Sequence, residues 1–574
     1  QVYSQSALET GKWYDKAPRR IMPGEERTKK GQHEHTKEIY HFLLGDPGMA
    51  NYSDKVIKSL EPENIKKLKS WNKDFTSKFD DDELKTVLRL SESIDKLWKL
   101  TADERKKIEE ATYEPLSVYG HEESGEESHK SIREKDEIYK KLFKSEKAKN
   151  AGPYARLKAA MDYWCALWFW PIDKADLLPS RQEFFFDMSL ILEGDIRAVN
   201  VNSSGQMIFK FEEDGSELSY VTEGDQLALE FKAQYADLGE VCLDNLRERS
   251  ERLAIANKIA NEQRFQHWEL EFADVFAENG GFDLILGNPP WINITWEIKN
   301  VVSDYYPEVM VKNKTAAEVN DMLLCDYIDD KVCMHSVLKE YVEVSAIQNF
   351  SNTSMNFDLL KGMQTDLYKC FIAKSFNLTN ERGVVGFVHP DSIYNDPKGE
   401  RIRTKLIDKL VYHFHFINEL KLFHEVDHHM EFSLNVYSNK SDNSFEAIYN
   451  LFSPDTVEFC FEENESNELG IKTINGEWNT TGDVRRIINV GEEEIRVFAD
   501  VFDGQKTCGP RLPALQTNEL MSVLIKISNC KKTIADIGDD IAVSGMWHET
   551  NDQKKGYIAL AKEDPIDQES MICT

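Results

Sequence analysis

The hydrophobic pattern of the first 150 residues has a helical period. Along 81–111, apolar residues recur at intervals of about three and four, as expected for one face of a helix: Leu84, Val87, Leu88, Ile94, Leu97 and Trp98. Ser53 is placed as an N-cap before the first such segment. The stretch 121–137 is polar with few apolar residues, so we predict a loop there. The pattern therefore predicts a helical region over 1–150.

A dense aromatic block follows in 154–181, formed by Met161, Tyr163, Trp164, Trp168, Phe169 and Trp170. A row of tryptophans can stack on bases, but side chains of this size more often fill a core. We predict core packing, with 151–264 as a connecting region packed on a catalytic domain. Within it, Glu230 and Lys232 form an E-x-K arrangement of the kind found in restriction nucleases, although such triplets are common by chance.

After residue 265 the pattern alternates between short apolar strands and helical stretches. The strands are predicted at 282–287, 383–390 and 432–438, and the helices at 366–379 and 401–414. Strands and helices that alternate in this way predict an open α/β sheet. Ligands of such sheets bind outside the carboxyl ends of the strands.

The first of these strands ends abruptly. Its apolar run, Phe282 to Leu286, predicts a buried strand and stops at Gly287, followed by Asn288, Pro289, Pro290 and Trp291. Two consecutive prolines cannot continue a sheet ladder, because each lacks an amide hydrogen and has a fixed φ. They make a stiff loop that presents the Asn288 side-chain oxygen and the Pro289 carbonyl in one direction, beside the indole of Trp291. The plain alternative is a proline turn after a strand.

Such a pair of acceptors suits an exocyclic amine on a planar ring. The lone pair of a nucleobase amine is delocalised into the ring, which makes the amine a poor nucleophile. Hydrogen bonds from both N–H groups to fixed acceptors favour the pyramidal amine and free its lone pair to attack a methyl sulfonium. This catalysis is geometric and electrostatic and needs no covalent enzyme intermediate.

The stretch "GFDLILGNPPW" resembles motif IV of the gamma-type adenine-specific (N6) DNA methyltransferases, which include type IIG restriction-modification enzymes and DISARM-like phage-defence methylases. Downstream, 365–396 resembles the helix of motif V and the strand of motif VI, and 417–438 resembles the pair around motif VIII. The resemblance covers about 265–440. It implies a Rossmann-like methyltransferase sheet and S-adenosylmethionine as the cofactor.

Residue roles also follow from this resemblance. Upstream of motif IV, 269–276 is similar to motif III, where the family's acidic residue, here Asp274, accepts from the adenine amine of the cofactor and the next residue, Val275, packs on that ring. The resemblance also implies that Asn288 contacts the cofactor. A ring at the position of Phe423 stacks on the flipped adenine opposite Trp291.

One family motif is missing from the chain. The glycine-rich motif I lets backbone amides approach the cofactor, but no G-x-G occurs here, and "LLGDPGMAN" (43–51) lacks the run of small residues. Motif I therefore lies before Gln1 in a longer protein, belongs to another chain, or has been lost with the cofactor site.

Composition bounds the class of protein. The chain has 574 residues, 41% of them hydrophobic and 30% charged, and no apolar window of membrane-spanning length, so we expect a globular, cytoplasmic protein without a membrane partner. The net charge of −31 argues against non-specific wrapping of nucleic acid. The nine cysteines lack metal-site spacing, so they are expected to be reduced packing residues, and no metal is expected.

The leading hypothesis is a site-specific adenine-N6 DNA methyltransferase of a restriction-modification or phage-defence system, which flips its target base from double-stranded DNA. Its catalytic domain is placed at 265–450 and the start of a target-recognition region at 451–574. Further candidate partners are other subunits of a defence complex or a phage protein. Two alternatives stay open: an RNA or protein methyltransferase with the same grip, and a catalytically silent, DNA-binding methylase-like subunit.

Overall fold

The fold is taken from a computed structural model that describes most of the 574 residues. The described ranges are 1–22, 29–30, 35–36, 38–113, 131–143, 146–194, 239, 241–325, 329–364, 366–439, 444–462, 466, 468–504, 507–530, 548, 552–553 and 555–557. Contacts divide the chain into two compact units, 1–518 and 519–574. The E-x-K arrangement at Glu230 and Lys232 lies outside the described residues.

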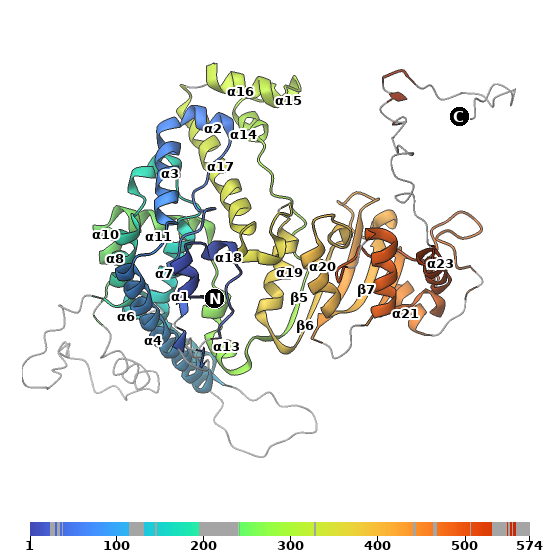
Figure 1. Cartoon of the computed structure of the whole chain (residues 1–574), viewed down its shortest axis with the longest axis horizontal. Helices are drawn as coiled ribbons and strands as arrows, with labels where there is room; N and C mark the ends of the chain where they lie inside the picture. The colour runs from blue at the N-terminus through green and yellow to red at the C-terminus, as the bar shows by residue number, and fades with distance from the viewer. Residues whose placement is uncertain are drawn as a thin grey trace, which may run out of the picture. The chain divides into compact units, whose positions relative to one another are not determined.

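Helices form most of the described residues before residue 280 (Figure 1). They are α1 (Gln5–Thr10), α2 (Lys55–Leu60), α3 (Pro62–Phe75), α4 (Asp81–Thr112), α5 (Ile132–Phe143), α6 (Glu146–Ala151), α7 (Pro153–Ala166), α8 (Arg181–Leu192), α10 (Leu243–Arg249), α11 (Glu251–Gln263), α12 (Trp268–Glu271) and α13 (Ala273–Asn279). Short strands β1 (Val2–Ser4) and β4 (Glu38–Tyr40) pair antiparallel near the N-terminus, as do β2 (Lys29–Lys30) and β3 (His35–Thr36).

The long helix α4 confirms the predicted helical period of its segment. Its N-terminus is closed by a capping box, in which the Asp80 carboxylate accepts from the backbone N–H of Asp82 and Glu83 while the Glu83 carboxylate accepts from the N–H of Asp80. Arg181, at the start of α8, pairs with Glu83 at 2.6 Å. The predicted apolar face is buried apart from Leu88, which is half-buried.

The loop predicted over 121–137 is wrong for its described end. Residues 132–137 belong to α5, and the rest of the segment, up to 130, lies outside the described residues. The helix begins where the Ser131 hydroxyl and backbone N–H both donate to the Glu134 carboxylate and the Glu134 N–H donates to the Ser131 hydroxyl. An S-x-x-E capping sequence therefore outweighs the low apolar content of the segment.

The aromatic block packs into the core, as predicted. Trp164, Trp168 and Trp170 are at most 3% exposed. The indole N–H of Trp164 donates to the Leu44 carbonyl at 2.8 Å, and that of Trp170 donates to the Lys174 carbonyl at 2.9 Å. Tryptophans that are buried with their N–H groups paired to backbone serve as core residues and are not available to stack on bases.

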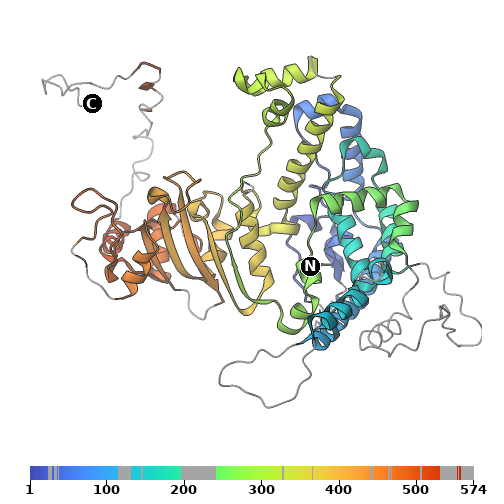
Figure 2. The same ribbon diagram turned by 180° about the vertical axis from the view of Figure 1, so that it is seen from behind.

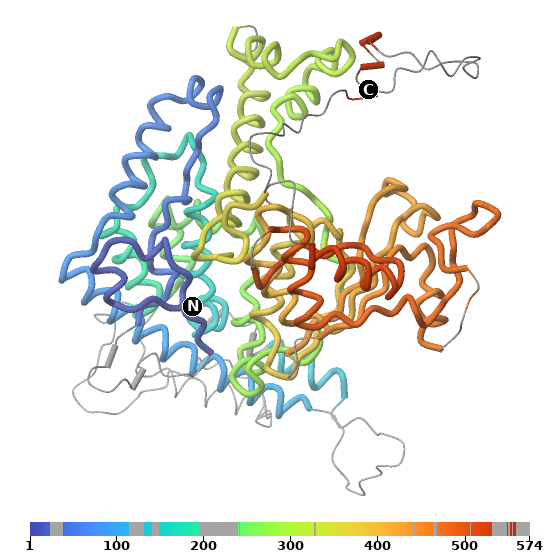
Figure 3. Tube along the Cα trace, turned by 45° about the vertical axis from the view of Figure 1, so that its right-hand side comes forward, coloured from blue at the N-terminus to red at the C-terminus, as the bar shows by residue number. Residues whose placement is uncertain are grey.

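A six-stranded mixed sheet follows the helices, in the order β10-β9-β7-β8-β6-β5. Its strands are β5 (Phe282–Gly287), β6 (Thr379–Pro390), β7 (Leu410–Ile417), β8 (Glu431–Ser438), β9 (Phe445–Leu451) and β10 (Ile488–Val490). β5 pairs parallel with β6, and β7 pairs parallel with β9, while β8 runs antiparallel between β6 and β7. The carboxyl ends of β5, β6, β7 and β9 therefore meet at one edge. Figure 3 follows the chain from the helices into this sheet.

A long connection separates β5 from β6. It contains α14 (Ile298–Tyr305), α15 (Glu308–Val311), α16 (Ala316–Cys325), α17 (Lys331–Ser351), α18 (Ser354–Phe357) and the crossover helix α19 (Leu367–Leu378). α17 contacts the N-terminal helices, because the Tyr341 hydroxyl accepts from the backbone N–H of Ser53 and Asp54 at 2.9 Å each. Figure 1 shows α19 and α20 (Glu400–Lys409) on one face of the sheet, and Figure 2 shows the strands from the other side.

One helix prediction needs correction. The helix predicted over 401–414 stops at Lys409, and 410–417 forms β7 instead. The alternating pattern of "LVYHFHFI" and its pairing with β8 and β9 on both sides explain the change of structure. The strand predicted over 383–390 is confirmed within the longer β6.

β5 is not the buried strand that its apolar run predicts. It lies at the end of the strand order, so among the described strands it pairs with β6 alone. Leu284 is 57% exposed and Leu286 is 70% exposed. A parallel strand normally has both faces and both edges covered, so β5 presents an apolar surface that a further chain segment can cover.

The remaining elements follow β8. They are α21 (Asp455–Phe461), α22 (Glu492–Phe498) and α23 (Asn518–Ser528), which continues from the first unit into the second. β9 and β10 extend the sheet to residue 490, past the boundary at 450 that the sequence predicts for the catalytic domain. Among the described helices, none has the length and apolar character needed to cross a membrane.

One buried carboxyl group gives a pH-dependent prediction for the helical part. Asp46 is 2% exposed; one of its carboxylate oxygens accepts from the Gly48 N–H, and the other has no partner among the described residues. Burial raises the Asp46 pKa to about 6. Because this pKa lies above the unfolded value, the protonated carboxyl favours folding at low pH, and this contribution is lost as the pH rises through 6.

Asp46→Asn should therefore raise the free energy of unfolding at pH 8 by up to about 3 kcal/mol and give no gain near pH 4. Thermal unfolding midpoints of the variant and the parent between pH 4 and 8 measure this difference, with the exposed Asp136→Asn as the control. Parallel pH profiles for Asp46→Asn and the parent would contradict the assignment.

Candidate active site

The ends of four strands bring several polar and charged residues to one edge of the sheet. Asn288 follows β5, Asp391 follows β6, and Asn418 follows β7, while β8, which runs in the opposite direction, begins there at Glu431. The sequence predicts a ligand site at the carboxyl end of β5. The structure places that end beside the ends of β6 and β7.

Asn288 has its side chain free at this edge. It is exposed and makes no hydrogen bond to a described residue, whereas Pro289 is buried and Pro290 is half-buried. The prolines therefore anchor the loop, and the Asn288 amide keeps its oxygen available as an acceptor.

Trp291 lies in a cluster of aromatic rings. Its centroid lies 5.1 Å from that of Phe423, with the rings inclined by 61°, and 5.7 Å from that of Phe432. Phe423 and Phe432 are themselves in edge-to-face contact at 5.0 Å. The indole N–H of Trp291 makes a long hydrogen bond of 3.4 Å to the Val388 carbonyl on β6.

The structure therefore brings together Trp291 and Phe423, the two rings that the sequence pairs as target-base stacking residues. It brings them into direct contact, however, and rings that touch edge to face leave no space for a planar base between them. Entry of a base requires Phe423 and Trp291 to separate.

Asn418 holds the segment that carries Phe423, and sequence reasoning missed it. The side chain is fully buried. Its amide donates to the carbonyls of Phe423 at 2.9 Å, Val426 at 3.1 Å and Asp427 at 3.2 Å, and its oxygen accepts from the Phe423 N–H at 2.9 Å. One side chain thus fixes both ends of the loop from 418 to 427. An asparagine immediately after an alternating strand is the only sequence signal of this role.

A buried polar network lies beneath these strand ends. His389 Nδ1 is 2.9 Å from the Pro390 carbonyl, which can only accept, so Nδ1 carries the proton and Nε2 accepts. Nε2 lies 2.8 Å from the Tyr437 hydroxyl and 2.9 Å from the Asn435 amide nitrogen. Burial lowers the His389 pKa to about 4, so the ring stays neutral. Both nitrogens of the His389 ring are therefore paired, which fixes the ring between β6 and β8.

Asp274 and Val275 lie on another part of the molecule. Both are half-buried on α13, whose neighbouring ring Phe272 packs on Phe282, the first residue of β5, at 5.1 Å between centroids. The six residues of β5 span about 20 Å, and Asn288 follows at the other end. The described residues therefore do not bring Asp274 and Val275 together with Asn288, and their cofactor contacts stay predictions.

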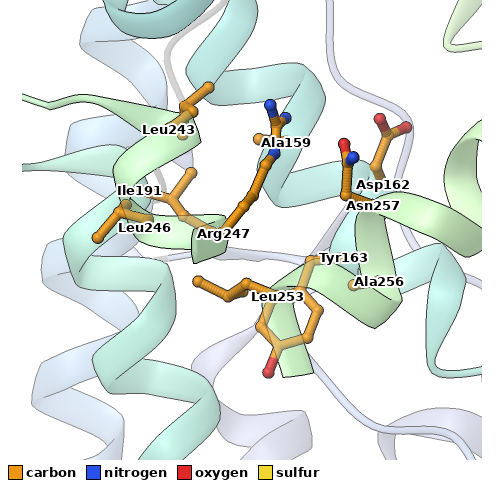
Figure 4. Close-up of a pocket in the computed structure, with 10 residues that line it drawn as sticks. All are labelled: Ala159, Asp162, Tyr163, Ile191, Leu243, Leu246, Arg247, Leu253, Ala256 and Asn257. Carbon is orange, nitrogen blue, oxygen red and sulfur yellow. The ribbon is translucent and has the colours of Figure 1, made fainter. Parts of the chain in front are cut away.

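A pocket in the helical part is too small for a cofactor. It lies among α7, α8, α10 and α11 and has a cavity volume of about 30 Å³ (Figure 4). Its walls are formed by Ala159, Asp162, Tyr163, Ile191, Leu243, Leu246, Arg247, Leu253, Ala256 and Asn257. A volume of this size holds about one water molecule, so this pocket is not a site for S-adenosylmethionine or for a nucleobase.

Residues 52–325 match the Eco57I restriction-modification methylase family. The matched segment begins in the helical part and includes Asp274 and the loop 288–291, but it ends before β6. It therefore extends the expected resemblance of 265–440 far toward the N-terminus. The match supports a restriction-modification methylase. No curated protein matches the chain in sequence.

Three solved structures align with the chain at low similarity. The type I restriction-modification system methyltransferase subunit from Streptococcus thermophilus is 11% identical and aligns over 76% of this chain and 96% of its own, with a TM-score of 0.20. The ATP-dependent Type ISP restriction-modification enzyme LlaBIII bound to DNA is 9% identical and aligns over 69% of this chain and 30% of its own, with a TM-score of 0.17. A nuclease-deletion mutant of the Type ISP restriction-modification enzyme LlaGI in complex with a DNA substrate mimic is 12% identical and aligns over 63% of this chain and 40% of its own, with a TM-score of 0.15. The chain thus spans less than half of either Type ISP enzyme.

The role of Asn418 is open to direct measurement. Asn418→Ala removes the four hydrogen bonds that join this buried side chain to the loop backbone. Backbone amides of 419–427 should exchange with deuterium at least tenfold faster in the variant, while β8 keeps its protection. Asn439→Ala is the matched control, because it removes only two exposed hydrogen bonds, one donated to the Glu381 carbonyl and one accepted from Lys409. Unchanged exchange in the loop would show that Asn418 does not hold it.

Proposed function

We propose that the protein is an adenine-N6 DNA methyltransferase that uses S-adenosylmethionine, in a restriction-modification or phage-defence system. The observation that carries this proposal is the loop 288–291, which follows β5 with the Asn288 amide free and Trp291 against Phe423. The match of 52–325 to a restriction-modification methylase family supports the reaction class.

The residues at the strand end suit an amine on a planar ring. The Asn288 oxygen and the Pro289 carbonyl accept the two hydrogens of the target N6 amine, which favours the pyramidal form and frees its lone pair. The buried Pro289 and half-buried Pro290 hold these acceptors in place before the base arrives. The two acceptors are therefore already oriented in the folded protein and do not have to reorganise during the reaction.

The aromatic cluster provides the pocket for a flipped base. Phe423 and Trp291 cover each other in the absence of DNA, and separation of the pair lets an extruded adenine stack on both rings. Phe432 packs behind them from β8 and keeps Trp291 in position. The contact between the two rings protects a surface that would otherwise be apolar and exposed.

The described residues alone do not form a cradle for S-adenosylmethionine, which supplies the methyl group in this class of reaction. Among the described strands, none pairs with the outer edge of β5, where Leu284 and Leu286 are exposed, and the sequence has no G-x-G turn. We therefore propose that the cofactor-binding site is completed by a further segment. This segment would pair with the outer edge of β5 and end beside Asn288. Asp274 and Val275 remain candidate cofactor contacts from the resemblance alone.

The open edge of β5 also supports a second candidate function. A methylase-like DNA-binding subunit without catalytic activity would keep the base pocket and would need no cofactor-binding site. Binding of S-adenosylmethionine by the protein in its natural assembly separates the two functions, because only the enzyme requires it.

Asn288→Ala should abolish methyl transfer and leave the fold intact, because the side chain is exposed and accepts from the amine rather than packing. Transfer of a radiolabelled methyl group to DNA that lacks N6-methyladenine should fall at least 100-fold, with an unchanged circular dichroism spectrum. Asn279→Ala, an exposed asparagine on α13, should retain full activity. Near-normal transfer by Asn288→Ala would disprove the role of this residue.

Phe423→Ala should weaken the stacking of an extruded base by about 1–3 kcal/mol. Fluorescence of 2-aminopurine at the methylated position reports extrusion, and its increase on binding of the protein should be reduced in the variant. Phe459→Ala, a 42% exposed ring on α21, is the matched control. An equal fluorescence change for Phe423→Ala and the parent would contradict the stacking role.

A further inference from the structure

The loop 288–291 continues into two residues that pair with the start of the crossover helix α19. The backbone N–H of Leu367 donates to the Ile292 carbonyl at 3.0 Å. Asn293 forms an antiparallel bridge with Asp366, and its side-chain amide donates to Asp366 Oδ1 at 2.7 Å. The downstream end of the loop is therefore fixed by the segment that begins α19.

Asp366 lies at the N-cap position of α19 but does not cap this helix. An N-cap aspartate normally accepts from the backbone N–H of the second or third helical residue, and the described helix shows no such hydrogen bond. The carboxylate instead accepts from Asn293 through Oδ1 and faces the Lys369 ammonium through Oδ2 at 2.8 Å. The side chain thus binds the loop and one lysine rather than the backbone of its own helix.

Lys369 is a buried cation with two carboxylate partners. Its side chain is 4% exposed, and a lysine buried to this extent needs opposite charges around its ammonium. Nζ lies 2.8 Å from Asp366 Oδ2 and 3.2 Å from Asp396 Oδ2. Asp396 belongs to the loop that follows β6, and its Oδ1 accepts from the Lys398 N–H at 2.9 Å. One ammonium group therefore connects the loops that follow β5 and β6.

Stability alone does not account for these charges. Taking an ammonium and two carboxylates out of water costs free energy that their attraction returns only in part, and apolar side chains of similar volume often stabilise a core as well. The charges instead define positions, because each of these ion pairs joins specific atoms. Asp366 and Asp396 are both partly exposed, so loss of the ammonium would let the two carboxylates turn toward water and release Asn293.

We propose that Lys369 is a positioning residue for the loop 288–291, and that it acts through Asp366 and Asn293. This inference rests on the proposed function, because the side chain that it orients is Asn288, the acceptor of the target amine. The Asn288 side chain makes no hydrogen bond to a described residue, so its direction depends on how firmly both ends of the loop are held. A displacement of about 1 Å at a reacting group can lower the rate about a hundredfold.

Hydrogen–deuterium exchange tests the anchor without methyl transfer. Lys369→Met removes the charge and keeps the length of the side chain, so the backbone amides of 291–293 should exchange about tenfold faster than in the parent. Lys374→Met is the matched control, because it removes the ion pair with Glu269 later on the same helix and should leave exchange of 291–293 unchanged. Exchange of 291–293 that is the same in Lys369→Met and the parent would overturn the proposal.

Kinetics test what the anchor does for catalysis, and the exposed Asn293→Ala provides a second variant if Lys369→Met does not fold. Each variant should lower kcat for methyl transfer to DNA about tenfold and change KM for DNA by less than about twofold, because the loop position matters in the transition state. The double variant should be no slower than the slower single variant, since both changes break one chain of contacts. Asn300→Ala, whose side chain donates to Glu297 on the exposed surface, should retain the kcat of the parent.

The outcomes separate this inference from the proposed function. Unchanged kcat in both single variants, or effects that multiply in the double variant, would overturn the positioning role of Lys369 even where Asn288→Ala abolishes transfer. A parent protein that transfers no methyl group would contradict the proposed function instead. Hydrogen exchange of 291–293 would then decide by itself whether Lys369 holds the loop.

Discussion

The parallel pairing of β5 with β6 is the constraint on which the candidate site depends. Because β5, β6 and β7 point in one direction, three loops that are distant in sequence start at one edge. Asn288, Asp391 and Asn418 each occupy the first position after a strand. The loop 288–291, the buried polar network and the loop that carries Phe423 therefore lie at the same edge of one sheet.

The aromatic residues of the helical part differ from those at the edge of the sheet in burial and in hydrogen bonding. Trp164 and Trp170 of the helical part are buried and donate to backbone carbonyls, so they stabilise the core. Trp291 is only half-buried, and its one hydrogen bond is long. Its partner Phe423 is also half-buried, and it lies on a loop held both by the Asn418 side chain and by the packing of Phe423 on Phe432.

Much of the fold and part of the site follow from local sequence. The helical period of α4, the core role of the tryptophans and the end of β5 at Gly287 are set by neighbours within a few residues. The capping box at Ser131 and Glu134 and the alternation that makes β7 a strand were also local signals, but low apolar content and a preceding helix obscured them.

The remainder depends on contacts that no local pattern encodes. Asp391 meets His413 only because β8 places β6 and β7 in one sheet, and the exposure of Leu284 and Leu286 follows from the position of β5 at the end of the strand order. The direct contact of Trp291 with Phe423 likewise needs the fold, because 132 residues separate them in the chain.

The most direct test of the central claim is to identify the methylated product. DNA from a host without its own base methylation would be incubated with the protein, in its natural assembly, and S-adenosylmethionine with a deuterated methyl group, then digested to nucleosides for mass spectrometry. The proposed chemistry at Asn288 predicts deuterated N6-methyladenine as the labelled nucleoside. A label on cytosine, or a label found only in RNA or protein, would contradict the account.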